Sequence, residues 1–173
     1  MEHKGIVMVY TGDGKGKTTA ALGLILRAVG HKHKVAFVQF MKGQQTGEVE
    51  ALSRYIPEVG IFRFGRDVFV DPNSPDPEDE RLAREGFLTV VELLGTDLDL
   101  LVLDEVNVAM SLGLVPAALL VDAVKQRNKK MTVVLTGRGL PSLVEDIADM
   151  ISEVREVRHH WRKGIPAQDG IEQ

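Results

Sequence analysis

The sequence predicts a single three-layer α/β domain, in which helices cover both faces of a mostly parallel sheet of about six strands. Two observations predict this fold. Short apolar runs rich in β-branched residues alternate with amphipathic stretches of helical period along the whole chain of 173 residues, and this alternation is typical of parallel sheets. No internal repeat, low-complexity tract or linker interrupts the alternation, so we expect one domain over residues 1–173.

The first five expected strands are short runs of mainly Val, Ile, Leu and Phe that carry almost no charge, as in strands buried on both faces, whereas the sixth is more polar. The first leads directly into a glycine-rich stretch, and the fourth is followed by two acidic residues. In chain order, the six expected strands cover residues 5–10, 35–40, 60–64, 100–103, 132–135 and 152–157.

The expected helices carry apolar residues at spacings of three and four. The first is followed by Gly30, which we expect to end it in a left-handed conformation. The third has the clearest start, because Asp76 can cap it, Pro77 suits its first turn and acidic residues follow. In chain order, the expected helices cover residues 19–29, 47–55, 76–95, 116–128 and 141–150.

The composition argues against several classes of protein. The net charge is −4, so no broad basic surface is available for nucleic acid. The chain has no cysteine, which excludes disulfides, zinc–thiolate sites and a thiol nucleophile. The longest uncharged run, residues 106–121, is shorter than the roughly 20 residues that a membrane-spanning helix needs. No signal peptide is visible, and we expect a cytoplasmic protein.

The stretch TGDGKGKTT, residues 11–19, lies between the first expected strand and the first expected helix. Glycines in that position let several backbone amides point into one concavity, and the free amides at the helix start add to it. Lys17 supplies a point charge for phosphate oxygens, and Thr18 supplies a hydroxyl for a magnesium ion. The alternative is a glycine-rich turn with two solvated lysines, which does not explain why Lys17 and Thr18 stand at the helix start. The stretch therefore predicts a phosphate-binding loop, or P-loop.

An acidic pair, Asp104 and Glu105, follows the fourth expected strand. Ligands of open α/β sheets bind at the carboxyl ends of the strands, where the glycine-rich loop also lies. A carboxylate in that place can hold magnesium directly or through water. On its own the pair would indicate a solvated turn, but together with the loop it predicts a nucleoside triphosphate site in a RecA-like P-loop NTPase fold.

The loop departs from the usual P-loop spacing, because Thr11 stands at the position of the first glycine. In this departure it resembles the P-loop type of ATP:corrinoid adenosyltransferases, whose loop reads Thr-Gly-x-Gly-Lys-Gly-Lys-Ser/Thr-Thr-Ala-Ala. More of the chain resembles that family in the same order. The matching segments are RAVGH at 27–31, VQFMKG at 38–43, LDEVN at 103–107, LTGRG at 135–139 and KGIPAQDGIE at 163–172.

The resemblance implies a specific reaction. In this family the cobalt(I) of a bound, reduced corrinoid attacks the 5′ carbon of ATP, triphosphate leaves and a cobalt–carbon bond forms. ATP is expected to lie reversed in the loop, so that the reacting carbon faces the corrinoid. Cobalt(I) is itself a strong nucleophile, so the protein has to align the reactants and neutralise the departing charge. The loop alone leaves two alternatives open: a small-molecule kinase or ATPase, and a non-catalytic ATP-sensing module.

The resemblance also implies which residues form the site. Lys17 and Arg138 are expected to act on the departing triphosphate, and magnesium is expected near Thr18, Asp104 and Glu105. The residues expected to bind ATP are Gly12, Asp13, Gly14, Lys15, Gly16, Lys17, Thr18, Thr19 and Arg27.

The corrinoid side is expected in the loop after the third strand, at Val68, Phe69 and Val70. Some relatives carry Phe and Trp where Val68 and Val70 stand here, which leaves Phe69 as the aromatic residue of an apolar wedge near cobalt. The tail over residues 159–173 is expected to close the site. The family further implies a homodimer, and a flavoprotein is the expected reductant of the corrinoid.

Overall fold

The computed structural model describes residues 4–68, 70–71 and 74–171 and confirms the predicted three-layer α/β fold. Within the described residues the sheet has six strands in the order β3-β2-β4-β5-β1-β6, and every pairing is parallel. The strands are β1 (Val7–Thr11), β2 (Val35–Phe40), β3 (Gly60–Phe64), β4 (Leu100–Asp104), β5 (Thr132–Thr136) and β6 (Met150–Glu153).

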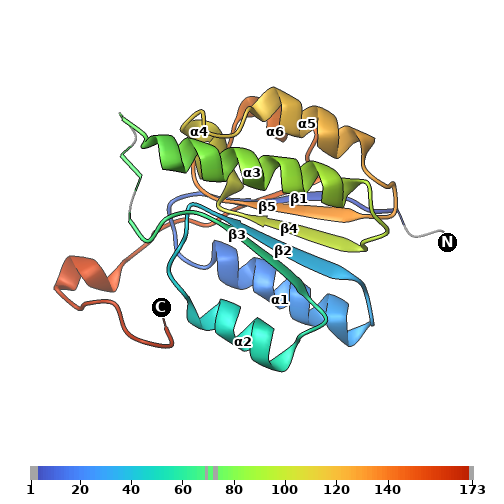
Figure 1. Cartoon of the computed structure of the whole chain (residues 1–173). Coiled ribbons are helices and arrows are strands. Elements are labelled where there is room, and N and C mark those ends of the chain that lie inside the picture. The colour runs from blue at the N-terminus through green and yellow to red at the C-terminus, as the bar shows by residue number, and fades with distance from the viewer. Residues whose placement is uncertain (1–3, 69, 72–73, 172–173) are drawn as a thin grey trace.

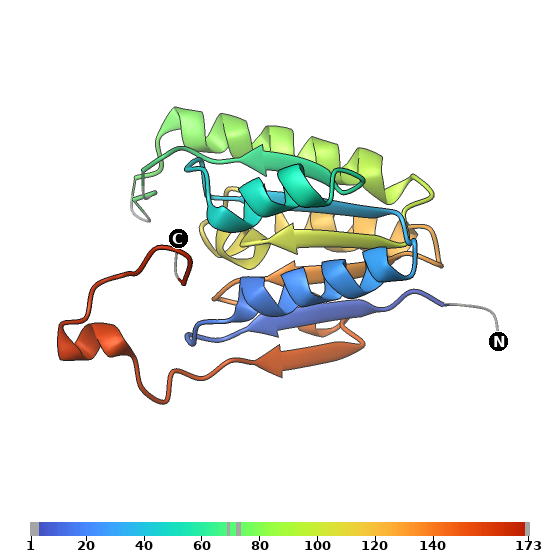
Figure 2. The ribbon, with the colours of Figure 1, turned by 90° about the horizontal axis from the view of Figure 1, so that it is seen from below.

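Helices cover both faces of the sheet (Figure 1). One face carries α1 (Lys17–Gly30) and α2 (Gly47–Tyr55), which lie in front of the sheet when the molecule is seen from below (Figure 2). The other face carries α3 (Pro77–Leu94), α4 (Val106–Ser111), α5 (Ala117–Gln126) and α6 (Ser142–Glu145). A short 3-10 helix, η1 (His160–Lys163), follows in the tail. No helix in the described part of the chain is both long and apolar enough to cross a membrane.

Successive residues of the central strands pack into two separate apolar cores. In β4, Leu100 and Val102 join the core beneath α1 and α2, whereas Leu101 and Leu103 join the core beneath α3, α4 and α5. All six residues of β2 are buried, including the polar Gln39. Burial on both faces explains why these strands appear in the sequence as continuous apolar runs rather than alternating ones.

The third helix begins where the sequence predicts. The Asp76 carboxylate accepts a hydrogen bond from the Glu78 amide at 2.9 Å, and the Asp79 carboxylate accepts one from the Asp76 amide at 3.3 Å. This reciprocal arrangement is a capping box, and Pro77 occupies the first turn. Local sequence therefore determines this boundary.

The end of the fold differs from the prediction of a helix over 141–150 and a strand over 152–157. Helix α6 covers only Ser142–Glu145, and β6 already begins at Met150. The cause is Asp149, whose amide donates to the Val7 carbonyl at 2.8 Å while its carboxylate accepts from the Val7 amide at 2.8 Å. Because these bonds tie the chain to β1, a longer helix is not possible there.

One further prediction is wrong, and one helix was not predicted. Gly30 is the last residue of α1 and does not have a positive φ; Lys32, with φ of 60°, takes the left-handed position instead. The amide of Lys32 donates to the Val29 carbonyl at 2.8 Å, so the chain continues its turn past Gly30. Helix α4 was not predicted; it is only six residues long and directly follows the acidic pair.

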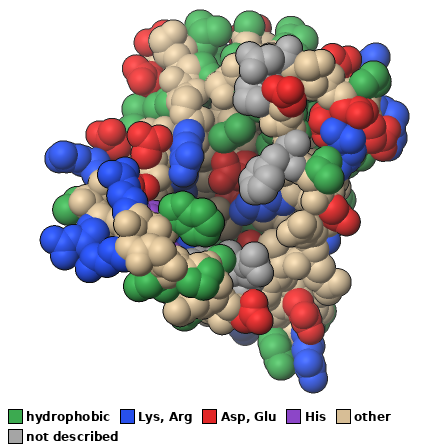
Figure 3. All heavy atoms as spheres, turned by 90° about the vertical axis from the view of Figure 1, so that its left-hand side faces the viewer, with side chains coloured by type: hydrophobic (Ala, Val, Ile, Leu, Met, Phe, Trp, Pro, Cys, Tyr) green, Lys and Arg blue, Asp and Glu red, His purple; other side chains and the backbone are tan. Residues whose placement is uncertain are grey.

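All strand carboxyl ends meet at one edge of the sheet, which lies on the left in Figure 1. Figure 3 looks onto this edge, where acidic and basic side chains surround a hollow. The glycine-rich loop follows β1 there, and the acidic pair follows β4, with β5 between them in the sheet. The fold therefore places the predicted loop and the predicted acids at the same edge.

Candidate active site

The loop between β1 and α1 depends on glycine for two separate reasons. Gly12 and Gly16 have φ of 94° and 111°, the left-handed region that favours glycine. A Cβ atom on Gly12 would lie 2.5 Å from the Val154 carbonyl oxygen, and one on Gly14 would lie 2.8 Å from the same oxygen. The Gly14 amide donates to that oxygen at 2.7 Å. The segment after β6 therefore packs directly against the back of the loop.

Lys17 is the first residue of α1, and only 7% of it is exposed. Its ammonium group donates to the carbonyl oxygens of Gly12 at 2.7 Å and Gly14 at 2.8 Å. Burial lowers the pKa of Lys17, while the nearby carboxylate of Glu105 opposes that shift. The loop thus holds its lysine through its own backbone carbonyls.

Asp104 ends β4, is completely buried and is hydrogen-bonded by side chains from three elements. Its Oδ1 accepts from the hydroxyls of Thr18 at 2.8 Å and Thr136 at 2.7 Å. Its Oδ2 accepts from Nε2 of Gln39 at 3.1 Å, and Lys42 Nζ lies 3.7 Å from the same oxygen. The structure therefore brings together the start of α1 and the carboxyl ends of β2, β4 and β5.

Glu105, the second acid, has a left-handed backbone with φ of 57°. Its amide donates to the Thr136 hydroxyl at 3.0 Å, which stabilises this uncommon conformation. Burial raises the pKa of Glu105, and the adjacent Asp104 raises it further, whereas Lys42 and Lys17 oppose the shift. A left-handed backbone at an acid whose pKa is shifted, as at Glu105, is typical of functional sites.

Arg138 reaches the loop from the carboxyl end of β5. Its Nη2 donates to the Asp13 carbonyl at 3.3 Å, and its Nε lies 3.8 Å from Asp13 Oδ1. Gly137, with φ of 126°, forms the turn that precedes it. The Arg138 side chain is 64% exposed, so its guanidinium remains open to a ligand at the mouth of the loop.

One of the residues predicted to bind ATP is not brought to the loop. Arg27 is exposed in the last turn of α1, ten residues after Lys17 and therefore about 15 Å along the helix axis. Val68 is exposed and Val70 half-buried in the segment after β3, while Phe69 lies outside the described residues. In the loop itself, the exposed side chains are those of Asp13, Lys15 and Thr19.

Sequence reasoning did not assign a role to Gln39, Lys42 or Thr136. All three lie at carboxyl ends of strands, within or directly after apolar runs. A polar residue inside a run as apolar as β2 was the available signal, because a buried polar group needs a partner. Gln39 Oε1 and Asn107 Oδ1 are buried without a hydrogen-bond partner in the described structure, although the Asn107 amide donates to the Gly137 carbonyl at 3.1 Å.

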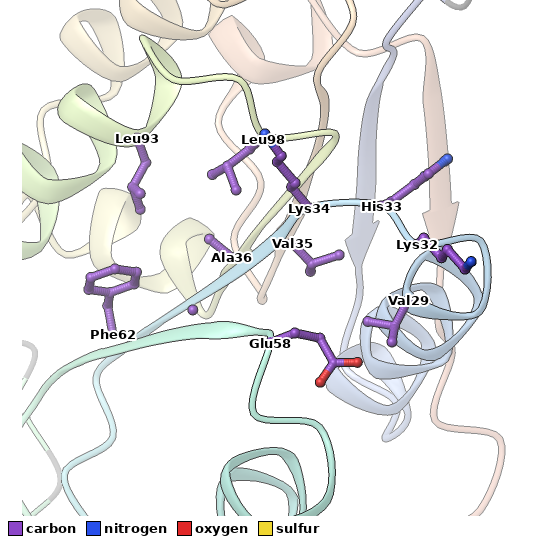
Figure 4. Close-up of a pocket in the computed structure, with 11 residues that line it drawn as sticks. Val29, Lys32, His33, Lys34, Val35, Ala36, Glu58, Phe62, Leu93 and Leu98 are labelled. Carbon is purple, nitrogen blue, oxygen red and sulfur yellow. The ribbon is translucent and has the colours of Figure 1, made fainter.

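A cavity of about 540 Å³ lies at the opposite edge of the sheet, where β2 and β3 begin (Figure 4). Its lining is mainly apolar, with Val29, Phe62 and Leu98 among the contributing side chains. Lys34, which also lines it, forms an ion pair with Asp97. The cavity contains neither the glycine-rich turn nor the acidic pair, and we therefore place the active site at the carboxyl edge.

The fold and the site define a P-loop nucleotide-binding protein, because a glycine-rich loop and a helix-start lysine face an acidic strand end. The chain belongs to the family ATP:corrinoid adenosyltransferase BtuR/CobO/CobP, because the sequence model of that family matches residues 3–173. It is 36% identical over 173 residues to the corrinoid adenosyltransferase of Escherichia coli, covering 99% of this chain and 87% of that protein.

Two other relatives support the same assignment. The corrinoid adenosyltransferase CobA of Salmonella typhimurium is 36% identical over 173 residues, with 99% of this chain and 87% of the relative covered. The corrinoid adenosyltransferase of Pseudomonas aeruginosa is 33% identical over 172 residues, with coverage of 99% and 85%. The family resemblance predicted from the loop is confirmed.

Proposed function

We propose that this chain transfers the 5′-deoxyadenosyl group of ATP to the cobalt(I) of a reduced corrinoid and releases triphosphate. The observation that carries the proposal is the convergence of Lys17, Arg138 and the acidic pair at one sheet edge, in a chain of the corrinoid adenosyltransferase family. In this reaction a cobalt–carbon bond forms, the bond between the 5′ carbon and oxygen breaks, and the electron pair leaves with triphosphate.

The chemistry assigns the protein two tasks, alignment and charge neutralisation, because the substrate cobalt is the nucleophile. We assign triphosphate binding to the loop amides from Gly12 to Thr19 and to the Lys17 ammonium. Arg138, exposed at the mouth of the loop, would neutralise charge on the leaving group. Lys17 would exchange its bonds to the Gly12 and Gly14 carbonyls for phosphate oxygens, which are stronger acceptors.

The residues at the acidic strand end fit a magnesium ion, which prefers oxygen ligands and usually keeps several waters. Thr18, Asp104 and Glu105 would hold it directly or through water: the Thr18 hydroxyl donates to Asp104 Oδ1 at 2.8 Å, and the Glu105 carboxylate lies near enough to Lys17 to influence its pKa. Within the described residues, no group of three or more His, Cys, Asp or Glu side chains could hold a metal by itself. Phosphate oxygens would therefore complete the coordination. When bound, magnesium would neutralise charge on the triphosphate.

The corrinoid side of the proposal uses the segment after β3, with Val68 and Val70 as apolar contacts and Phe69 outside the described residues. The tail would close the site, and its described part, residues 159–171, carries the exposed side chains of Trp161 and Ile171. We also propose a homodimer, a flavoprotein reductant and, because ATP is the co-substrate, a cytoplasmic location. The nucleotide-binding role that the family resemblance implies for Arg27 stays a prediction.

An anaerobic assay with ATP, magnesium and chemically reduced cobalamin tests the proposed function. Loss of the cob(I)alamin spectrum should accompany the formation of one triphosphate per turnover. Lys17→Ala should abolish the reaction, whereas Lys125→Ala, an exposed lysine on α5, should not change it. Release of ADP would instead indicate a kinase or ATPase, and tight ATP binding without turnover would indicate an ATP-sensing module.

A further inference from the structure

Lys42 follows β2 and points back to the buried carboxylate of Asp104. Met41 has φ of 64°, the left-handed region that a non-glycine residue seldom adopts, and its amide donates to the Phe64 carbonyl at 2.9 Å. This turn brings Lys42 Nζ to 3.7 Å from Asp104 Oδ2. The Lys42 side chain is 35% exposed, so its ammonium group contacts the acid and also faces the open edge of the sheet.

The backbone around Lys42 is packed against the segment after β3 without space between the two. A Cβ atom on Gly65 would lie 2.3 Å from the Lys42 nitrogen, and one on Gly43 would lie 2.4 Å from the Arg66 carbonyl carbon. The Gly43 amide donates to the Arg66 carbonyl at 2.9 Å. The position of the Lys42 backbone is therefore determined by the segment that begins at Gly65.

Two arginines hold this pair of segments in place. The Arg63 guanidinium donates to the carbonyls of Gly43 and Gln44. Arg66 forms a bidentate pair with the buried Asp79 on α3, at 2.8 Å to Oδ1 and 2.7 Å to Oδ2. Bidentate arginine–carboxylate pairs fix geometry as well as charge. Through its backbone and its side chain, Arg66 thus connects the Lys42 turn to the start of α3.

We propose that Lys42 is a further triphosphate-binding residue of this enzyme, held in position by the Arg66–Asp79 pair. The proposal rests on the proposed function, since it concerns the same polyphosphate. Lys17 and Arg138 approach the site from the ends of β1 and β5, whereas Lys42 approaches from β2, on the other side of β4. It therefore supplies positive charge from the side of β4 opposite to Lys17 and Arg138.

The competing interpretation is that Lys42 is only a counter-ion of Asp104. Asp104 is already hydrogen-bonded by Thr18, Thr136 and Gln39, and Lys42 lies farther from it than any of these groups do. A lysine with a flexible stem at such a distance can turn to a bound anion without leaving the acid unpaired. The two interpretations differ in what removal of the ammonium does to anion affinity.

Isothermal titration calorimetry with magnesium tripolyphosphate, without corrinoid, tests the proposal. Lys42→Met should raise the Kd for tripolyphosphate about tenfold or more, the usual effect of losing one charge-assisted bond. Lys42→Arg should remain within about threefold of the wild type, because the charge is kept. Lys34→Met, at the opposite edge of the sheet, should leave the Kd for tripolyphosphate unchanged. The proposal is overturned if Lys42→Met binds tripolyphosphate as tightly as the wild type.

A double-mutant cycle tests the positioning role of Arg66. Arg66→Met should weaken tripolyphosphate binding in the wild type but add little in the Lys42→Met background, because Arg66 acts through Lys42. Arg81→Met, which removes two exposed ion pairs on α3, the helix that carries Asp79, is the matched control. Equal effects of Arg66→Met in both backgrounds would refute this role. If Lys17→Ala abolishes tripolyphosphate binding while Lys42→Met leaves the Kd unchanged, this inference fails and the proposed function stands.

Discussion

Replacement of Thr136 by valine should destabilise the protein and its site together. The Thr136 side chain is completely buried. Its hydroxyl donates a hydrogen bond to Asp104 Oδ1 at 2.7 Å and accepts one from the Glu105 amide at 3.0 Å. Valine keeps the shape of threonine and removes both bonds. Loss of the bond to the carboxylate costs about 1.5–3 kcal/mol, and the partly buried Glu105 amide left without a partner adds up to about 1–3 kcal/mol.

These contributions are not independent, since they share one hydroxyl, and we expect a net loss of about 3 kcal/mol. For a chain of this size that loss corresponds to a fall in Tm of about 6–12 °C. Thermal unfolding followed by circular dichroism measures it, with Thr136→Ser as the variant that keeps the hydroxyl. Thr96→Val is the matched control, because Thr96 is exposed and bonds only within its own turn. A Thr136→Val variant as stable as the wild type would refute the hydrogen-bond reasoning.

Two other substitutions test the glycine-rich loop and the Arg66–Asp79 pair. Gly14→Ala should raise the Kd for ATP about tenfold or more, because its Cβ would lie 2.8 Å from the Val154 carbonyl oxygen. Gly23→Ala is the control and should bind ATP normally, because the space around Gly23 is open. Equal ATP affinity of the two variants in calorimetry would contradict the packing argument. Asp79→Asn should lower stability at neutral pH, because Arg66 holds the pKa of Asp79 below its ordinary value. That contribution is present above an ordinary aspartate pKa of 3.8 and is lost as pH falls through the lower folded pKa, so the difference in unfolding free energy between variant and wild type should shrink in acid. A difference that does not change with pH in urea denaturation would argue against the ion pair.

The first five strands and the start of α3 could be predicted because their signals are local. A strand buried on both faces requires a continuous apolar run, as in β4, and a capping aspartate followed by proline marks a helix start wherever the helix packs. The end of α6 could not be predicted in this way. It depends on Asp149 bonding to Val7, a residue 142 positions earlier in the chain.

The position of Lys17, Thr18 and Asp104 at one edge of the sheet could be predicted because each follows or ends a strand that has its own local signal. Lys17 and Thr18 follow β1, Asp104 ends β4, and any parallel sheet brings such strand ends to one edge. Lys42 and Thr136 join them because β2 and β5 are the two neighbours of β4. That neighbour relation is a property of the assembled sheet and has no local pattern in the sequence.

The contact between the phosphate loop and the segment after β6 is made by main-chain atoms of Val154 and Arg155. Evolution can therefore exchange the side chains at these two positions freely, since every amino acid except proline offers the same amide and carbonyl. It cannot do so at Gly12 and Gly14, where any added carbon meets that backbone. Divergent members of the family should accordingly differ at 154 and 155 while both glycines stay fixed.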